Sequence, residues 1–454
     1  MVVATDTRAH RTGTHRPGTH RPGTRRLATG ASAHELTAII GDLLGTDGHD
    51  LPIRIETYDG GVLGPADAAT SLMVRSPDAL RYILTAPGEL GFARAYVAGA
   101  LDVDGDIFEA LRLRDNLPDV RIGAKEWAAL ARLVGHTGLR RPPLPKEEAR
   151  LHGRRHTPER DAAAIHHHYD VSNDFYRIVL GDTMTYSCAV WPDNSGNGHE
   201  PATLDDAQAH KYDLICRKLG LHPGMRLLDV GCGWGGMVVH AARNYGVEAV
   251  GVTLSRSQLE YAQRAAEIAG VADRVEFRLQ DYRGVADGTF DAISSIGMFE
   301  HVGKARLHEY FARLHTLLRP QGRLLNHAIS RPPGDGHAHF HRRGFIDRYV
   351  FPDGELHEVG TVVSAIQQEG FEVRHVETLR EHYARTLRAW VANLERDWDA
   401  AAAATTTGRA RIWRLYMAAS AMNFEAGRTQ VHQVLGVRSD DGRSAMPLRP
   451  DWGS

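Results

Sequence analysis

The fold of this 454-residue chain is decided by one stretch, Met225-Arg226-Leu227-Leu228-Asp229-Val230-Gly231-Cys232-Gly233-Trp234-Gly235-Gly236. Its first half is a short apolar run typical of a buried strand, and residues 237–245 have apolar side chains at helical spacing. A strand, a glycine turn and a helix let the backbone approach a nucleotide-like ligand at the carboxyl edge of a parallel sheet. The stretch therefore predicts a doubly wound α/β domain with a ligand site at this turn.

The spacing of the glycines separates two kinds of nucleotide site. A dinucleotide turn has the pattern Gly-x-Gly-x-x-Gly, whereas here Gly231, Gly233 and Gly235 alternate and Asp229 stands two positions before the first of them. A Cβ at these glycines would collide with the ligand or forbid the dihedral angles of the turn. This Asp-x-Gly-x-Gly form resembles the first motif of class I methyltransferases, which bind S-adenosylmethionine. Asp229 would supply charge complementary to that cationic ligand.

The units that follow agree with a class I methyltransferase sheet. Three further short apolar strands are expected at residues 248–252, 275–279 and 290–296. No acid follows the first of them, so Thr253, Leu254 and Gln258 are expected to bind the ribose side of the cofactor in its place. The next strand ends in Gln280, Asp281 and Tyr282, which are expected to hold adenine.

The remaining sequence predicts a second, smaller domain and several connecting segments. Residues 33–137 have mixed helix and strand patterns, typical of a small α+β domain: helices at 35–44, from Pro77, at 91–97 and at 107–113, and strands at 53–58 and 71–74. Polar, basic or Pro/Gly-rich composition indicates a disordered basic tail at 1–32, a linker at 138–160 and a C-terminal tail at 437–454. The α/β block between them, 161–436, is the predicted methyltransferase domain.

Composition excludes several classes of protein. The net charge of −2 gives no global attraction to nucleic acid, and no run of about 18 apolar residues predicts a membrane span. The three cysteines form no disulfide framework, which is typical of a reducing cytoplasm. His166, His167 and His168 are consecutive and cannot all face one ion from a regular element, so no metal is expected. The prediction is a cytoplasmic protein that is at most peripheral to a membrane.

Six motifs in order resemble the cyclopropane fatty acid synthases, which include the mycolic acid cyclopropane synthases. The resemblance covers roughly residues 160–435. The matching segments are residues 168–176, 185–191, 228–236, 298–303, 327–329 and 382–387, and Ala93–Gly99 resembles the segment that precedes the catalytic domain in longer members.

The resemblance implies a reaction and a set of site residues. Such enzymes transfer a methyl group from S-adenosylmethionine to the double bond of an unsaturated phospholipid acyl chain, through a carbocation that a bound bicarbonate deprotonates. By motif match, Tyr186 and Ser187 would contact the cofactor. Glu300, His327 and Tyr383 would hold the bicarbonate through side chains. Cys188, Gly297 and Ile329 would contribute mainly backbone. Ser172 and Val190 depart from the family pattern and were expected near the acyl entrance.

The sequence leaves the product and two rival functions open. The product is either a cyclopropane or a methylene-branched chain of the 10-methylene stearate type. A small-molecule N- or O-methyltransferase, or a non-catalytic lipid-binding relative, could use the same fold. The expected partners are an unsaturated lipid and the inner face of a membrane, with residues 342–351 as an interfacial loop. A reductase partner and a homo-oligomer are compatible with this function, and no nucleic acid is expected.

Overall fold

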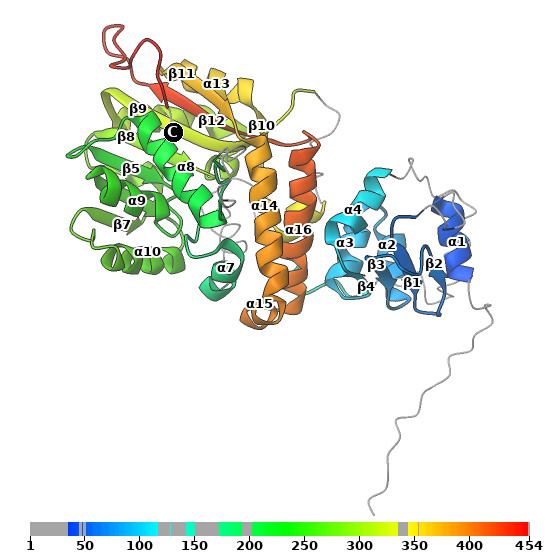
Figure 1. Ribbon diagram of the computed structural model, residues 1–454. Coiled ribbons are helices and arrows are strands. Elements are labelled where there is room, and N and C mark those ends of the chain that lie inside the picture. The colour runs from blue at the N-terminus through cyan, green and yellow to red at the C-terminus, as the bar shows by residue number, and fades with distance from the viewer. Residues whose placement is uncertain are drawn as a thin grey trace, which may run out of the picture.

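The computed structural model describes residues 35–44, 48, 51–116, 128, 142–149, 172–192, 202–334, 344–352 and 354–452. It has two folded parts, with helices α14 and α16 standing side by side between the large sheet and the small N-terminal part (Figure 1). The predicted tail at 1–32, the outer portions of the predicted linker and His166–His168 lie outside the described residues.

The large part is built on an eight-stranded sheet of order β11-β12-β9-β8-β5-β6-β7, with β10 paired to β9. Its strands are β5 Arg226–Val230, β6 Glu248–Thr253, β7 Val275–Leu279, β8 Phe290–Ile296, β9 Leu318–Arg331, β10 His357–Glu358, β11 Glu372–Thr378 and β12 Gln430–Val437. Strands β5 to β9 run parallel, and β12 is antiparallel to both β9 and β11. The chain reverses its direction of travel across the sheet between β5 and β8, and ligands bind at such switch points. The prediction of a doubly wound class I methyltransferase sheet is confirmed.

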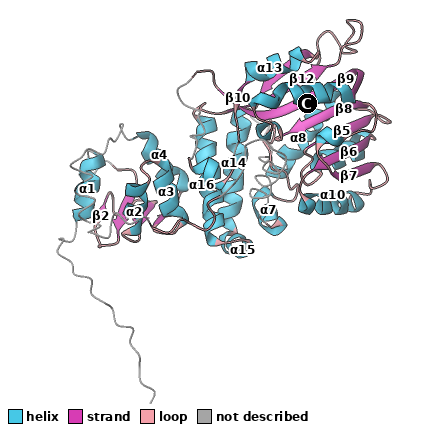
Figure 2. Ribbon diagram, turned by 180° about the vertical axis from the view of Figure 1, so that it is seen from behind, coloured by secondary structure: helices cyan, strands magenta, loops and turns pink. Residues whose placement is uncertain are grey.

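Helices cover both faces of this sheet (Figure 2). The flanking helices are α8 Leu204–Leu219, α9 Gly236–Tyr245, α10 Arg256–Ile268, α11 Leu307–Leu317 and α13 Val359–Gln368. Successive residues of β5 point to opposite faces, so Leu227 joins a core with α8, α9 and α10, while Leu228 joins one with α11 and α13. Two-sided burial explains why the strand sequences are continuously apolar rather than alternating.

A second group of helices lies beyond the carboxyl ends of the strands. They are α7 Asn173–Leu180, α12 Phe345–Tyr349, α14 Arg380–Arg396, α15 Trp398–Ala404 and α16 Thr407–Glu425. Their apolar side chains share one buried cluster with Ala93, Tyr96 and Phe108 of the N-terminal part. The two parts of the molecule are therefore joined by a common core.

The N-terminal part is a four-stranded mixed sheet with helices against it, of strand order β2-β1-β3-β4. Its elements are α1 Glu35–Leu44, β1 Arg54–Thr57, β2 Val62–Leu63, β3 Ser71–Val74, α2 Asp78–Thr85, α3 Glu89–Val97, β4 Leu101–Asp104 and α4 Ile107–Asn116. The expected helices and strands are present. Pro77 is the N-cap of α2 rather than its first helical residue, and β2 and β4 were not expected from the sequence.

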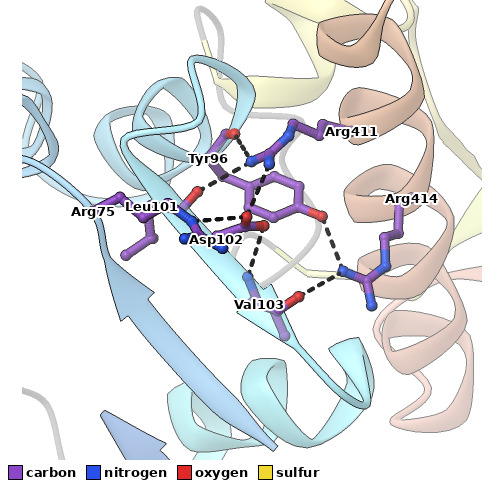
Figure 3. Close-up of polar contacts among 7 residues, drawn as sticks. All are labelled: Arg75, Tyr96, Leu101, Asp102, Val103, Arg411 and Arg414. Atoms are coloured by element: carbon purple, nitrogen blue, oxygen red, sulfur yellow. Dashed lines mark hydrogen bonds and ion pairs between the residues drawn. The ribbon is translucent and has the colours of Figure 1, made fainter. Parts of the chain in front are cut away.

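Two arginines of α16 fasten the N-terminal part to the rest of the molecule (Figure 3). Arg411 donates to the carbonyl of Tyr96 at 2.9 Å and to the carboxylate of Asp102 at 3.0 Å. Arg414 donates to the Tyr96 hydroxyl at 3.3 Å and to the Gly105 carbonyl at 3.0 Å. The docking surface is thus polar as well as apolar.

The described piece of the predicted linker, residues 142–149, ties the same two parts together. Glu148 is buried and accepts two hydrogen bonds from Arg94 of α3, at 2.9 and 2.7 Å. It also accepts from the Tyr349 hydroxyl of α12 at 2.9 Å.

At the other end of the chain, residues 438–452 lie against the sheet domain, where Arg438 donates to the carbonyl of His315 at 3.1 Å. Among the described helices, none is long and apolar enough to cross a membrane.

Candidate active site

A cavity opens at the switch point of the sheet, where β5 and β8 end. Eleven of the twelve predicted cofactor residues line it: Tyr186, Ser187, Asp229, Gly231, Gly233, Thr253, Leu254, Gln258, Gln280, Asp281 and Tyr282. The βα units supply the residues from Asp229 to Tyr282, and the segment before α8 supplies Tyr186 and Ser187, so the fold brings together residues almost 100 positions apart. We refer to this space as the cofactor cavity.

The glycine turn serves two different purposes. Gly231 has a φ of +79°, and a Cβ there would stand 2.9 Å from the Met298 side chain. Gly235 is not among the residues that line the cofactor cavity. A Cβ at Gly235 would lie 2.8 Å from Ala262 and from Phe277. Its missing side chain permits α9 to pack closely, and no ligand is needed to explain it.

Asp229 is the buried acid at the floor of the cofactor cavity. Its carboxylate accepts a hydrogen bond from the Ser294 hydroxyl at 2.7 Å, and the residue is 2% exposed. Burial raises the pKa of Asp229 to about 6, although the Ser294 hydroxyl and the Lys211 ammonium oppose the shift. The carboxyl group is therefore mostly ionised at neutral pH, and a cationic ligand would stabilise the ionised form further.

Thr253 and Gln258, which are expected to bind the ribose in place of an acid, are hydrogen-bonded to each other. The Thr253 hydroxyl donates to the Gln258 side-chain oxygen at 2.8 Å, and both residues are buried. Asp281, beside the expected adenine position, accepts from the backbone N–H of Arg283 at 2.9 Å. Burial tends to raise the pKa of Asp281, but hydrogen bonds from Arg283 outweigh it and leave the pKa lowered.

A second cavity adjoins the first and contains all six predicted catalytic residues: Cys188, Gly297, Glu300, His327, Ile329 and Tyr383. Four residues line both cavities: Tyr186, Ser187, Gly297 and His301. Much of the remaining lining is apolar or aromatic, with Phe345, Phe351, Leu387, Tyr416 and Phe424 among it. We refer to this space as the apolar cavity.

Glu300 projects its carboxylate into this apolar surrounding. One oxygen accepts from the backbone N–H of Ile329 at 2.7 Å, and the other is buried without a partner among the described residues. Burial raises the pKa of Glu300 to about 7, with the Ile329 N–H acting in the opposite direction. The alternative of a solvated helix-start acid is wrong, because the carboxylate is enclosed.

The two backbone groups of the predicted set have other partners. The Ile329 N–H is used by Glu300, and the Gly297 N–H donates to the carbonyl of His327 at 2.9 Å. Neither N–H is therefore free to bind an anion in this structure; one holds the Glu300 carboxylate and the other holds the backbone of His327.

His327 presents the other unpaired polar atom of the apolar cavity. It lies on β9, is 2% exposed, and its Nε2 has no partner among the described residues. Its Nδ1 is 3.3 Å from the side-chain nitrogen of Gln433. Burial is the main cause that lowers the pKa of His327, and the Lys211 and Lys218 ammonium groups lower it further. The imidazole is therefore neutral.

Tyr383 and Cys188 complete the wall near these two groups. Tyr383 is buried on α14, and its ring lies 4.7 Å from that of Phe424. Cys188 is fully buried, and its Sγ is 3.1 Å from the carbonyl of Ala189. Burial raises the pKa of the Cys188 thiol, so it is protonated and does not act as a nucleophile.

Two residues that the sequence singled out have structural contacts away from the apolar cavity. Ser172 caps α7 by accepting from the Phe175 N–H at 3.2 Å, Val190 is a core residue, and neither is among the residues that line the apolar cavity. In the expected interfacial loop, Phe345 is buried and faces the apolar cavity, while Arg342 and Arg343 lie outside the described residues.

The missed residues share a position behind the site rather than in it. Lys211 is completely buried and donates to the Ser187 hydroxyl at 2.8 Å. Gln433 stands behind His327. Lys211 stands among other charged residues of α8, so nothing in the sequence sets it apart as buried, and β12 offers no signal for Gln433.

Comparisons with known proteins agree with this geometry. A family model described as mycolic acid cyclopropane synthetase matches residues 156–434. A probable fatty acid methyltransferase of Mycobacterium tuberculosis is 47% identical over 413 residues, with 88% of this chain and 95% of that protein covered. Cyclopropane-fatty-acyl-phospholipid synthase of Escherichia coli is 32% identical over 383 residues, with 83% and 90% covered.

A solved structure extends the agreement to three dimensions. Mycolic acid cyclopropane synthase CmaA1, complexed with SAH and CTAB, superimposes with a TM-score of 0.55 at 34% identity, over 61% of this chain and 98% of that one. The matched family model, the relatives along nearly the whole chain and the shared sheet lead to one conclusion. The chain belongs to the mycolic acid cyclopropane synthetase family and is a class I S-adenosylmethionine-dependent methyltransferase.

Proposed function

We propose that the protein methylates the double bond of an unsaturated phospholipid acyl chain through a carbocation, and that it uses bicarbonate as the base. The product is a cyclopropane or a methylene-branched acyl chain. One observation carries this proposal: Glu300 Oε2 and His327 Nε2 are both buried and unpaired among the described residues, in a cavity that adjoins the cofactor cavity.

These two atoms fit bicarbonate. The Glu300 carboxylate can only accept a hydrogen bond when ionised, and a neutral His327 with its proton on Nε2 would donate one. Leaving either atom buried without a partner costs roughly 1–3 kcal/mol, which a ligand of matching polarity would recover. An anion that also carries an O–H group satisfies both at once, and in this site it would supply a base.

The apolar cavity is suited to an acyl chain and a cation. Tyr186 stands at the junction of the two cavities, with ring centroids 5.3 Å from those of both Trp390 and Trp413 and 6.1 Å from that of Tyr176. Aromatic faces stabilise a positive charge without offering a nucleophile, at about 0.5–2 kcal/mol each. The same rings exclude water, which would otherwise trap the carbocation.

We further propose that the substrate reaches the apolar cavity from the inner face of a membrane, with the protein cytoplasmic and peripheral. Support comes from the name of the Escherichia coli relative, whose acyl substrate is carried by a phospholipid. The apolar side chains of α12 and α16 that line the cavity would allow a hydrocarbon chain to bury its apolar surface away from water.

The test is direct. The protein is incubated with S-adenosylmethionine and dioleoyl phospholipid vesicles, with and without added bicarbonate in degassed buffer, and the fatty acids are analysed before and after mild hydrogenation. A methylated acyl product that depends on bicarbonate is expected. Hydrogenation saturates a methylene product and spares a cyclopropane. Absence of any acyl product would refute the lipid function and favour a small-molecule substrate or a non-catalytic role.

A further inference from the structure

Behind His327, polar side chains form a row across three adjacent strands. In the strand register, His327 of β9 pairs with Gln433 of β12, and Gln433 pairs with Glu377 of β11. Lys218 reaches the row from α8 and is completely buried. Its Nζ lies 2.6 Å from the side-chain oxygen of Gln433 and forms an ion pair with Glu377. None of Gln433, Lys218 and Glu377 lines the apolar cavity.

The row fixes the direction of every hydrogen bond in it. A lysine ammonium group can only donate, so the atom of Gln433 that faces Lys218 is the amide oxygen. The amide nitrogen of Gln433 consequently faces His327 Nδ1, at 3.3 Å. An amide NH₂ also only donates, so Nδ1 must accept and carries no proton. A neutral imidazole then has its one proton on Nε2, which is the unpaired atom in the apolar cavity.

We infer that Gln433, oriented by Lys218, is a positioning residue that holds His327 as the Nε2–H tautomer, a hydrogen-bond donor to an anion and not a general base. This inference rests on the proposed function, because it specifies how the same site recognises its anion. The arrangement resembles the outer partners that orient histidine ligands in metal sites, where one ring nitrogen is fixed so that the other performs the task.

The electrostatic surroundings favour a neutral ring. Burial, then Lys211 and Lys218 of α8, then His432 of β12 all lower the pKa of His327. The other titratable side chains that line the apolar cavity are Glu89, Tyr186, Cys188, Glu300, His301, Asp347, Glu355, Tyr383, Tyr416 and Arg428. A positively charged His327 would be penalised by two buried ammonium groups, so a fixed neutral tautomer is the state that these surroundings select.

The deciding variant is Gln433→Glu. A glutamate keeps the size of the side chain and the contact with Lys218, but its second oxygen only accepts. Nδ1 must then carry the proton, and Nε2 becomes an acceptor that repels the lone pairs of an anion. We expect the bicarbonate concentration that gives half-maximal activity to rise at least tenfold, with the affinity for S-adenosylhomocysteine unchanged. The variant should also acquire a new pH dependence of activity, because the carboxylate favours a protonated ring.

The matched control is Gln430→Glu, the same substitution three residues earlier on β12, opposite Ser330 and outside the apolar cavity. We expect its bicarbonate dependence to stay within twofold of the wild type. A merely structural role for Gln433 would lower thermal stability in Gln433→Glu without moving the bicarbonate dependence or the pH profile, and that result would overturn the inference.

A second measurement decides the matter independently of turnover. Nitrogen NMR of ¹⁵N-histidine-labelled wild-type protein, with the His327 signals identified by their loss in His327→Asn, reports which ring nitrogen is protonated. A protonated Nε2 and a bare Nδ1 are expected, and the opposite tautomer or a doubly protonated ring would refute the inference even if Gln433→Glu failed to fold. Because this readout needs no lipid product, it also separates failure of this inference from failure of the proposed function.

Discussion

Replacing Lys211 with methionine should make the protein more stable while leaving its shape intact. Lys211 is buried completely, with one hydrogen bond to the Ser187 hydroxyl at 2.8 Å and its ammonium 4.4 Å from the centre of the Tyr212 ring. Burial lowers the pKa of Lys211 from the ordinary 10.5 to about 7, although Cys188 and Asp229 act in the opposite direction. Methionine has a similar length and no charge to bury.

The magnitude follows from that pKa. Lowering the pKa of an amine from 10.5 to about 7 means that the folded state is penalised by about 4 kcal/mol at pH 7 for a group that is protonated when unfolded. The penalty is greatest below pH 7, declines as the pH rises, and vanishes above 10.5. Losing the hydrogen bond to Ser187 costs roughly 1 kcal/mol. Lys211→Met should therefore raise the free energy of unfolding by roughly 2–3 kcal/mol at pH 7.

Urea unfolding of the wild type and of Lys211→Met at pH 7 and pH 9 measures this effect. The quantity compared is the change in the free energy of unfolding of each protein between the two pH values. From pH 7 to pH 9 the free energy of unfolding of the wild type should rise by about 2 kcal/mol relative to that of Lys211→Met. Only the wild type has a buried lysine whose unfavourable charge is lost as the pH rises. Lys146→Met, at an exposed lysine, should behave as the wild type does. Equal pH dependence in Lys211→Met and the wild type would show that Lys211 is not a buried charge, and the reasoning would fail.

Three further perturbations test the site and the docking of the N-terminal part. Glu300→Gln should reduce acyl methylation by about 10²–10³ while S-adenosylhomocysteine binding, measured by calorimetry, stays unchanged; near-normal turnover would remove Glu300 from the mechanism. Asp229→Asn should weaken calorimetric binding of S-adenosylmethionine by about tenfold or more because the complementary charge is lost, and unaltered affinity would contradict that role. Arg411→Ala leaves the largely buried carboxylate of Asp102 with Arg75 as its remaining ion-pair partner among the described residues, so we expect a loss of about 2–3 kcal/mol in stability and faster proteolysis between the two parts. An unchanged cleavage rate would mean that the apolar core alone holds the parts together.

The sequence predicts those features of the fold that are encoded locally. The strand at 226–230 and the glycine turn after it were predicted because apolar runs, turn residues and helical periodicity are all properties of neighbouring residues. The βα order then placed Thr253, Gln280 and their neighbours at one edge of the sheet, since parallel strands end on the same side. The crowding of Gly235 by Ala262 and Phe277 could not be predicted, because the spacing of glycines does not show which side of the backbone is crowded.

Long-range register is what the sequence could not provide. Gln433 stands opposite His327 only because β12 inserts antiparallel between β9 and β11, a pairing of residues more than 100 positions apart. Lys211 lies on a helix whose burial depends on the sheet beneath it. The motifs that the chain shares with its family identified Glu300 and Tyr383, but their common cavity needed the tertiary structure.

The position of β12 in the sheet has a consequence for how the two cavities are encoded. The glycine turn and every residue that lines the cofactor cavity precede residue 307. The support behind His327 comes from Gln430–Val437, the last strand of the sheet, which carries Gln433 and fills the gap between β9 and β11. Along the chain, the strand that supports His327 therefore comes after all the residues that line the cofactor cavity. Pairing of β12 between β9 and β11 completes both the sheet and the polar row behind His327.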